Sequence, residues 1–177
     1  MEDDASHRII VGVSGSPGSL HALRRAVAEA RLRNSVIWSV ITWVPQGGEV
    51  ANRRMPCPDL LRLWRDAAAQ RLCTAWQEAL GGIPDDLDAN LFALRGTPGR
   101  RLVQLADREN DLLVVGAGTS GALRRLVKGS VSRYCLSRAQ CAVLTVPPTA
   151  AQRRLEHHPL ARRRIVRDLA RYDTSRS

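Results

Sequence analysis

Aromatic residues are scarce in this chain: Phe, Trp and Tyr together make up 4% of its 177 residues. Hydrophobic residues as a whole make up 44%, so the core has to be built mainly from Leu, Val, Ile and Ala side chains. The length fits one domain of ordinary size with an extension. We therefore expect one folded domain with an aliphatic core.

The cysteines show neither a C-x-x-C pair nor a nearby histidine pair at zinc spacing; they are Cys57, Cys73, Cys135 and Cys141. This pattern predicts reduced thiols. The first residues, Met-Glu-Asp-Asp, are acidic where a signal peptide would be basic. No apolar run reaches the roughly 20 residues that a transmembrane helix needs. We expect a soluble, cytoplasmic protein with no transmembrane segment.

Negative charge is also in short supply. The chain has 17 Asp and Glu against 27 Lys and Arg, and Lys128 is the single lysine. The net charge of +10 suits anionic partners. Charge alone does not choose between a nucleotide, a nucleic acid and a membrane.

Short apolar runs predict five strands, at 8–13, 36–44, 87–94, 112–116 and 142–146. Apolar residues at helical spacing predict four helices between them, at 19–33, 58–80, 97–106 and 129–138. Ser19 is the predicted N-cap of the first helix, and residues 45–58 are predicted to be irregular. Alternating strands and helices predict an α/β fold, a single doubly wound domain around a parallel sheet. It spans residues 8–148, between a tail at 1–7 and an extension at 149–177.

A glycine-rich loop, Gly116-Ala-Gly-Thr-Ser-Gly121, follows the fourth predicted strand, and Gly129-Ser130 opens the next helix. Glycines let the backbone approach a ligand closely, and free N–H groups at a helix start bind anions. Ligands of such sheets bind at the carboxyl ends of the strands, where the strand order reverses. The loops after the first and fourth strands would then be neighbours, and the pattern predicts a phosphate site there.

Two phosphate-binding motifs fit this loop system poorly. Gly116-x-Gly118-x-x-Gly121 matches the dinucleotide fingerprint, but no Asp or Glu follows before Glu156 to hold a ribose. Ser14-Gly-Ser-Pro-Gly-Ser19 faintly resembles the Ser-Gly-Gly-x-Asp-Ser loop of ATP pyrophosphatases, without its second glycine and its aspartate. Neither loop contains a Gly-x-Ser-x-Gly nucleophile elbow.

The whole order of elements resembles the universal stress protein family. The segments that carry the resemblance are Ile10–Ser19, Gly96–Pro98, Asp111–Gly116, Gly129–Ser132 and Cys141–Pro147. The family's distinctive frame is Gly, two residues, Gly, nine residues, Gly-Ser/Thr, and here it runs from Gly116 through Thr119 to Gly129-Ser130. The resemblance covers about residues 7–148. It implies a five-stranded sheet of order 3-2-1-4-5, of the Rossmann-like, adenine nucleotide alpha hydrolase-like type.

Two positions depart from the nucleotide-binding members of the family. Thr119 stands where they have the second glycine, which puts a side chain where a phosphate would approach the backbone. Ser14 stands where they have an aspartate that lies against the nucleotide. Gly118 and Gly121 lie beside Thr119 and offer a compensating close approach.

The resemblance implies a stress-response regulatory protein that binds ATP and acts by binding rather than catalysis, with Mg²⁺ entering only with ATP. The residues that it places at the nucleotide are Gly12, Val13, Ser14, Val40, Gly116, Gly118, Thr119, Gly129, Ser130, Val131 and Ser132. These loops contain no Asp, Glu or His that could act as a general base, except His21 just inside the first predicted helix. We therefore expect at most weak ATP hydrolysis. The alternative is a dimeric adapter of the same fold that binds no nucleotide and acts through protein contacts and its basic tail.

The patterns of two further segments indicate binding partners, a second copy of the chain and an anionic molecule or surface. The strand 142–146 is apolar and expected at the sheet's edge, which invites pairing; family members commonly pair there, so we expect a homodimer. From residue 151 onward, eight arginines stand against three acids, and apolar residues recur at helical spacing at Ala161, Ile165, Leu169 and Tyr172. Such a basic amphipathic helix can bind an acidic protein, an anionic membrane or nucleic acid, or pack on its own domain.

Overall fold

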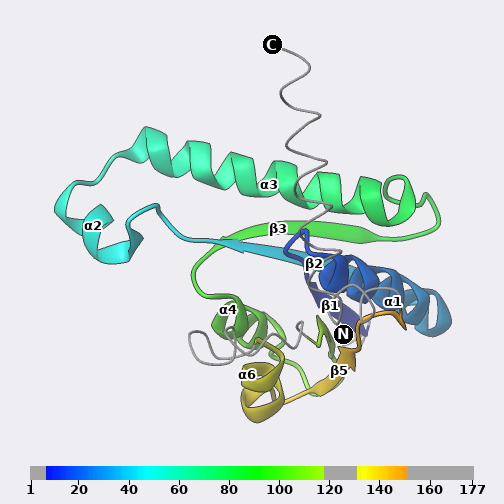
Figure 1. The fold of residues 1–177 in the computed structure, drawn as a ribbon. Helices are drawn as coiled ribbons and strands as arrows, with labels where there is room; N and C mark the ends of the chain where they lie inside the picture. The colour runs from blue at the N-terminus through cyan, green and yellow to red at the C-terminus, as the bar shows by residue number, and fades with distance from the viewer. Residues whose placement is uncertain (1–6, 118–130, 151–177) are drawn as a thin grey trace, which may run out of the picture.

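A five-stranded parallel sheet forms the centre of the molecule (Figure 1). The computed structural model describes residues 7–117 and 131–150. The strands lie in the order β3-β2-β1-β4-β5, and neighbours run parallel. Their bounds are Arg8–Gly12 for β1, Val36–Trp43 for β2, Ala89–Arg95 for β3, Leu112–Gly116 for β4 and Ala142–Val146 for β5. The predicted fold class and strand order are confirmed.

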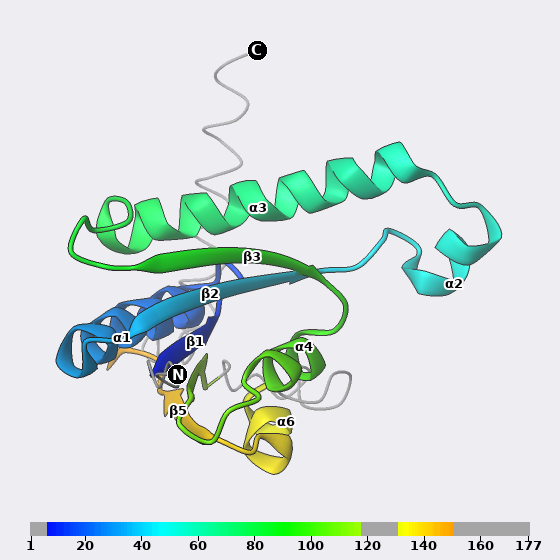
Figure 2. The same ribbon diagram turned by 180° about the vertical axis from the view of Figure 1, so that it is seen from behind.

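Helices cover the sheet on both faces. One face carries α1 (Pro17–Arg33) and α3 (Pro58–Leu80), and the other carries α4 (Pro98–Leu105) and α6 (Val131–Arg138). Seen from behind in Figure 2, α3 runs alongside β3 and continues past it toward α2. Within residues 7–117 and 131–150, no helix is long and apolar enough to cross a membrane.

The core consists of two apolar layers, one on each face of the sheet. Ile9 packs in the layer under α1 and α3, whereas Ile10 packs in the layer under α4 and α6, because successive side chains of a strand point to opposite faces. Both side chains are fully buried. Trp76 of α3 is also buried, and its indole N–H donates to the Ser39 hydroxyl at 2.8 Å. Burial on both faces explains why the strands read as continuous apolar runs.

α1 begins at a different serine from the predicted one. Ser16 is the N-cap, and its hydroxyl accepts a hydrogen bond from the Ser19 N–H at 3.3 Å. Ser19 lies inside the first turn, where its own hydroxyl donates to the Ser16 carbonyl at 2.9 Å. The prediction of Ser19 as the cap was wrong, because Pro17 fixes a helical φ and starts the helix earlier.

The segment 45–58 is not wholly irregular, as was predicted, because α2 spans Gly48–Arg54. It follows Gly47, whose left-handed φ of 80° turns the chain, and none of its side chains is buried. In α3 the buried residues lie between Ala68 and Ala79. α2 and the first turns of α3 therefore project beyond the sheet (Figures 1 and 2).

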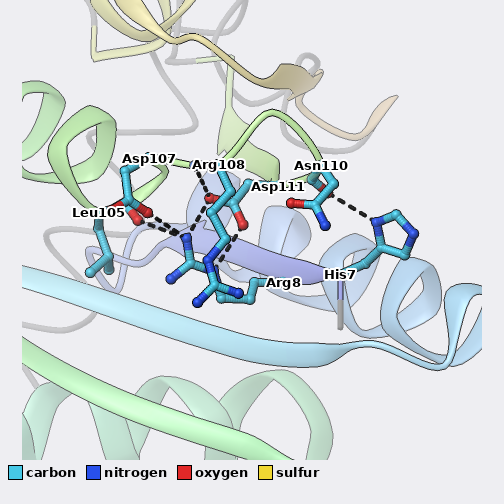
Figure 3. A network of polar contacts seen from close by, with 7 residues as sticks. All are labelled: His7, Arg8, Leu105, Asp107, Arg108, Asn110 and Asp111. Atoms are coloured by element: carbon cyan, nitrogen blue, oxygen red, sulfur yellow. Dashed lines mark hydrogen bonds and ion pairs between the residues drawn. The ribbon is translucent and has the colours of Figure 1, made fainter. Parts of the chain in front are cut away.

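A buried ion pair lies at the amino-terminal ends of β1 and β4 (Figure 3). The Arg8 guanidinium at the start of β1 donates to both carboxylate oxygens of Asp111, at 2.9 and 2.7 Å, and to Asp107 at 2.6 Å. The same guanidinium lies 4.5 Å from the centre of the Trp38 ring. Asp111 also accepts from the Arg108 N–H at 3.0 Å. This network holds the starts of β1 and β4 together, at the strand ends opposite those of the predicted site.

Candidate functional site

The carboxyl ends of β1 and β4, with the part of β2 that pairs with the end of β1, bring several of the predicted nucleotide residues together. Gly12 is paired in register with Val40, and the Val13 N–H donates to the Val40 carbonyl at 2.8 Å. Gly116 ends β4, the other neighbour of β1. The strand order reverses between β1 and β4, where ligands of doubly wound sheets bind. Four further predicted residues, Gly118, Thr119, Gly129 and Ser130, lie outside the described residues.

The loop after β1 presents hydroxyl groups at these strand ends. The Ser14 hydroxyl lies 3.0 Å from that of Ser16 and 3.3 Å from that of Ser19. Gly15 has a φ of +77°, which favours glycine and turns the chain between them. Ser14 and Ser16 are exposed. The loop therefore presents uncharged hydroxyl groups, and residues 13–19 contain no carboxylate.

Two glycines of the predicted site have a packing role. A Cβ atom at Gly116 would lie 2.8 Å from the carbonyl oxygen of Gly18, so the glycine lets the first turn of α1 pack against the end of β4. A Cβ atom at Gly12 would lie 2.8 Å from a methyl group of Leu102 in α4. Both glycines shape the site by letting a helix approach the sheet closely.

The other described residues of the predicted site are largely buried. Val40 and Ser132 are buried, and Val131 packs partly buried in the layer under α4 and α6. His21 reaches from α1 to the end of β5, where its Nδ1 lies 3.1 Å from the Pro147 carbonyl oxygen. The predicted histidine of these loops is thus engaged with the backbone after β5.

Two cysteine thiols, those of Cys135 and Cys141, are shielded by burial. Burial raises the pKa of the Cys135 thiol to about 11 and also raises the pKa of the Cys141 thiol. At neutral pH such thiols stay protonated, and the thiolate is the nucleophilic form. Within the described part of the chain, no three His, Cys, Asp or Glu side chains gather in a way that could hold a metal ion.

A charged cluster that no sequence pattern indicated lies at the carboxyl end of β3. Arg95 makes two hydrogen bonds to the Glu49 carboxylate of α2, at 2.9 and 2.6 Å. These bonds hold the pKa of Glu49 below its usual range and raise the pKa of Arg95. The Arg95 guanidinium lies 5.8 Å from the centre of the Trp43 ring. Because 46 residues separate Glu49 from Arg95, no local motif could have signalled the pair.

The fold and the loops at the strand ends define a doubly wound α/β protein of the Rossmann-like class. The family model described as "Universal stress protein family" matches residues 5–147. The chain belongs to the universal stress protein family.

Known relatives agree with this assignment. A universal stress protein of Mycobacterium tuberculosis is 29% identical over 150 residues, a match that covers 79% of this chain and 48% of that protein. This chain therefore spans about half the length of that relative. A solved universal stress protein in complex with cAMP is 28% identical, has a TM-score of 0.52, and is matched over 82% of this chain and 99% of its own. A universal stress protein of Archaeoglobus fulgidus in complex with dAMP is 20% identical, with a TM-score of 0.52 and coverage of 78% and 96%, and supports the fold alone.

Proposed function

We propose that this chain binds an adenine nucleotide, ATP in the first place, at the carboxyl ends of β1 and β4, and acts by binding. The observation that carries the proposal is the meeting of the Ser14–Ser19 loop with Gly116 at the point where the strand order reverses. The relative at 28% identity, solved with cAMP, supports an adenine nucleotide as the ligand. A stress-response regulatory role follows from the family.

Binding without efficient catalysis fits the chemistry of these loops. The sequence contains no Asp or Glu in residues 13–19 or 117–132. His21 bonds to the Pro147 carbonyl through Nδ1, which leaves Nε2 as its one possible base, and no carboxylate in these loops is present to orient an attacking water. The serine hydroxyls replace one carboxylate with neutral groups, which lowers the repulsion of a phosphate. Mg²⁺ would enter with ATP, bound mainly by the phosphates.

Calorimetric titration of the full chain with ATP and with cAMP tests the proposal. We expect saturable binding of one nucleotide per chain. Gly129→Asp should weaken it about a hundredfold or more, because a carboxylate would face the phosphates and like charges repel by several kcal/mol. Ala67→Asp makes the same charge change at an exposed position of α3 and should leave the affinity unchanged. Absence of heat with both nucleotides, or equal affinity in Gly129→Asp, would refute the proposal.

One observation favours the second candidate, a dimeric adapter that binds no nucleotide. β5 pairs with β4 on one side only, and its other edge is unpaired among the described residues. An adapter would use this edge to pair with a second copy, and its Arg-rich extension to hold an acidic partner. It would give no heat with either nucleotide and would still dimerise.

A further inference from the structure

A solvent-open surface pocket of about 560 Å³ lies at the carboxyl end of β3, beside the start of α4. We call it the arginine pocket. Its lining residues are Glu49, Arg95, Gly96, Thr97, Arg100, Arg101 and Gln104. None of these residues belongs to the set predicted for the nucleotide, and β2 lies between β3 and β1 in the sheet.

Two of the three guanidinium groups in this pocket are held by hydrogen bonds. Arg101 donates from Nε to the Arg95 carbonyl at 2.6 Å and from Nη1 to the Gln104 side chain at 3.2 Å. A Cβ atom at Gly96 would lie 2.7 Å from the Arg101 Nε, so the glycine makes room for this guanidinium. Arg95 is held by Glu49. Arg101 is therefore positioned before any ligand arrives, whereas Arg95 is oriented by a carboxylate that an anion can replace.

The third guanidinium is available to a ligand. Arg100 is exposed and has neither a hydrogen bond nor an ion pair among residues 7–117 and 131–150. The start of α4 adds donors, because the Thr97 hydroxyl does not cap the helix and its first turn contains no acid. With three arginines and one glutamate, the lining residues carry a net formal charge of +2.

The Glu49 carboxylate binds the Arg95 guanidinium where the anionic group of a ligand would bind it. It belongs to α2, which has no buried side chain. The Glu49–Arg95 pair is the one ion pair that joins α2 to the sheet within the described chain. Both side chains are partly exposed, so the pair is weak and a competing anion can replace the carboxylate.

We propose that the arginine pocket binds the phosphate group of a small molecule, which takes the place of Glu49 on Arg95. An arginine guanidinium can donate two parallel hydrogen bonds to two oxygens of one phosphate group. A phosphate ester carries about −1.5 to −2 charges at pH 7, which balances the lining better than one carboxylate does. The volume lies in the range of small-molecule sites, about 300–1,000 Å³. Replacement of Glu49 would release α2 from the end of β3.

The test is calorimetric titration of the full chain carrying Gly129→Asp, which closes the proposed nucleotide site to phosphates. The titrants are inorganic pyrophosphate and ribose 5-phosphate, which separate a free phosphate from a phosphate ester. We expect one of them to bind at one site per chain. Arg100→Ala should weaken that binding about tenfold, as expected for loss of a charged hydrogen bond. Glu49→Gln should tighten it about two- to fivefold, because the competing carboxylate is gone.

Two controls separate the arginine pocket from other sites. Arg62→Ala removes an exposed arginine of α3 that is paired with Asp59, and it should leave the affinity unchanged. Every titration uses the Gly129→Asp background, because the proposed nucleotide site would otherwise bind the same phosphate compounds. No binding of either phosphate compound, or equal affinity in Arg100→Ala and Arg62→Ala, would overturn the proposal. An unchanged affinity in Glu49→Gln would overturn the competition with Glu49.

Discussion

At the scale of single residues, Gly116 has a packing role that does not depend on the ligand contact predicted for it. The sequence pattern assigns it to the nucleotide frame, and the structure places it against the backbone of α1. Its contact is with a carbonyl oxygen, which cannot rotate away as the Leu102 methyl group facing Gly12 can. The close approach of α1 to β4 therefore depends on this glycine whether or not a nucleotide is bound.

Gly116→Ala should lower the free energy of unfolding by about 1–3 kcal/mol, the usual effect of overpacking. Gly18→Ala is the matched control, because nothing lies within 4 Å of a Cβ atom there. Alanine in a helix is favoured over glycine by about 0.5–1 kcal/mol, so this control should be neutral or stabilising. Urea denaturation of both variants measures the difference. Equal stability of the two would contradict the packing role of Gly116.

The places of two predicted site residues in the fold could be deduced from the sequence. Gly12 and Gly116 are the last residues of β1 and β4, and a continuous apolar run shows in the sequence where a strand ends. The Glu49–Arg95 pair could not be predicted in this way. It joins a surface helix to a distant strand, and only the three-dimensional fold brings the two charges together.

At the scale of elements, burial decided which predictions held. The bounds of α3 and β5 follow the predicted ranges, 58–80 and 142–146, because proline or glycine residues mark an end of each. α2 was missed because its seven residues have no buried face and hence no apolar periodicity to detect. The cap of α1 was misplaced because three serines compete within six residues.

Burial also divides α3 into two unlike halves. Leu72 is 1% exposed and packs in the layer with α1, whereas Leu63 is 61% exposed on the projecting part. Leu72→Ala should lower the free energy of unfolding by about 2–5 kcal/mol through lost burial and a residual cavity. Leu63→Ala should change it by less than about 0.5 kcal/mol, as at other exposed sites. Thermal or urea unfolding of this pair checks the claim. A large effect of Leu63→Ala would mean that the projecting turns are covered by a partner.

At the scale of the whole molecule, the sheet has two edges with different surroundings. β3 lies at one edge, and β5 lies at the other. The order of the sheet follows from the family resemblance. The number and direction of the strands follow from the alternation of strands and helices. Assembly could not be deduced in the same way, because an unpaired edge in one chain looks the same whether or not a second chain covers it.

The β5 edge is where we expect a second copy to pair. β5 is short and apolar, and its unpaired N–H and C=O groups offer a template for another strand. Ala142 opens the strand with an exposed side chain. Ala142→Lys should convert the dimer to a monomer of 19.5 kDa in light scattering coupled to size exclusion, because lysine on an edge strand opposes pairing.

Ala67→Lys is the matched control for this variant. It adds the same charge at an exposed alanine of α3 and should leave the dimer intact. A monomeric unmodified chain, or an Ala142→Lys variant that still dimerises, would place assembly elsewhere. If Ala67→Lys alone dissociated the dimer, the projecting half of α3 would be the interface, and the exposed apolar side chains there would be explained by contact with a second copy.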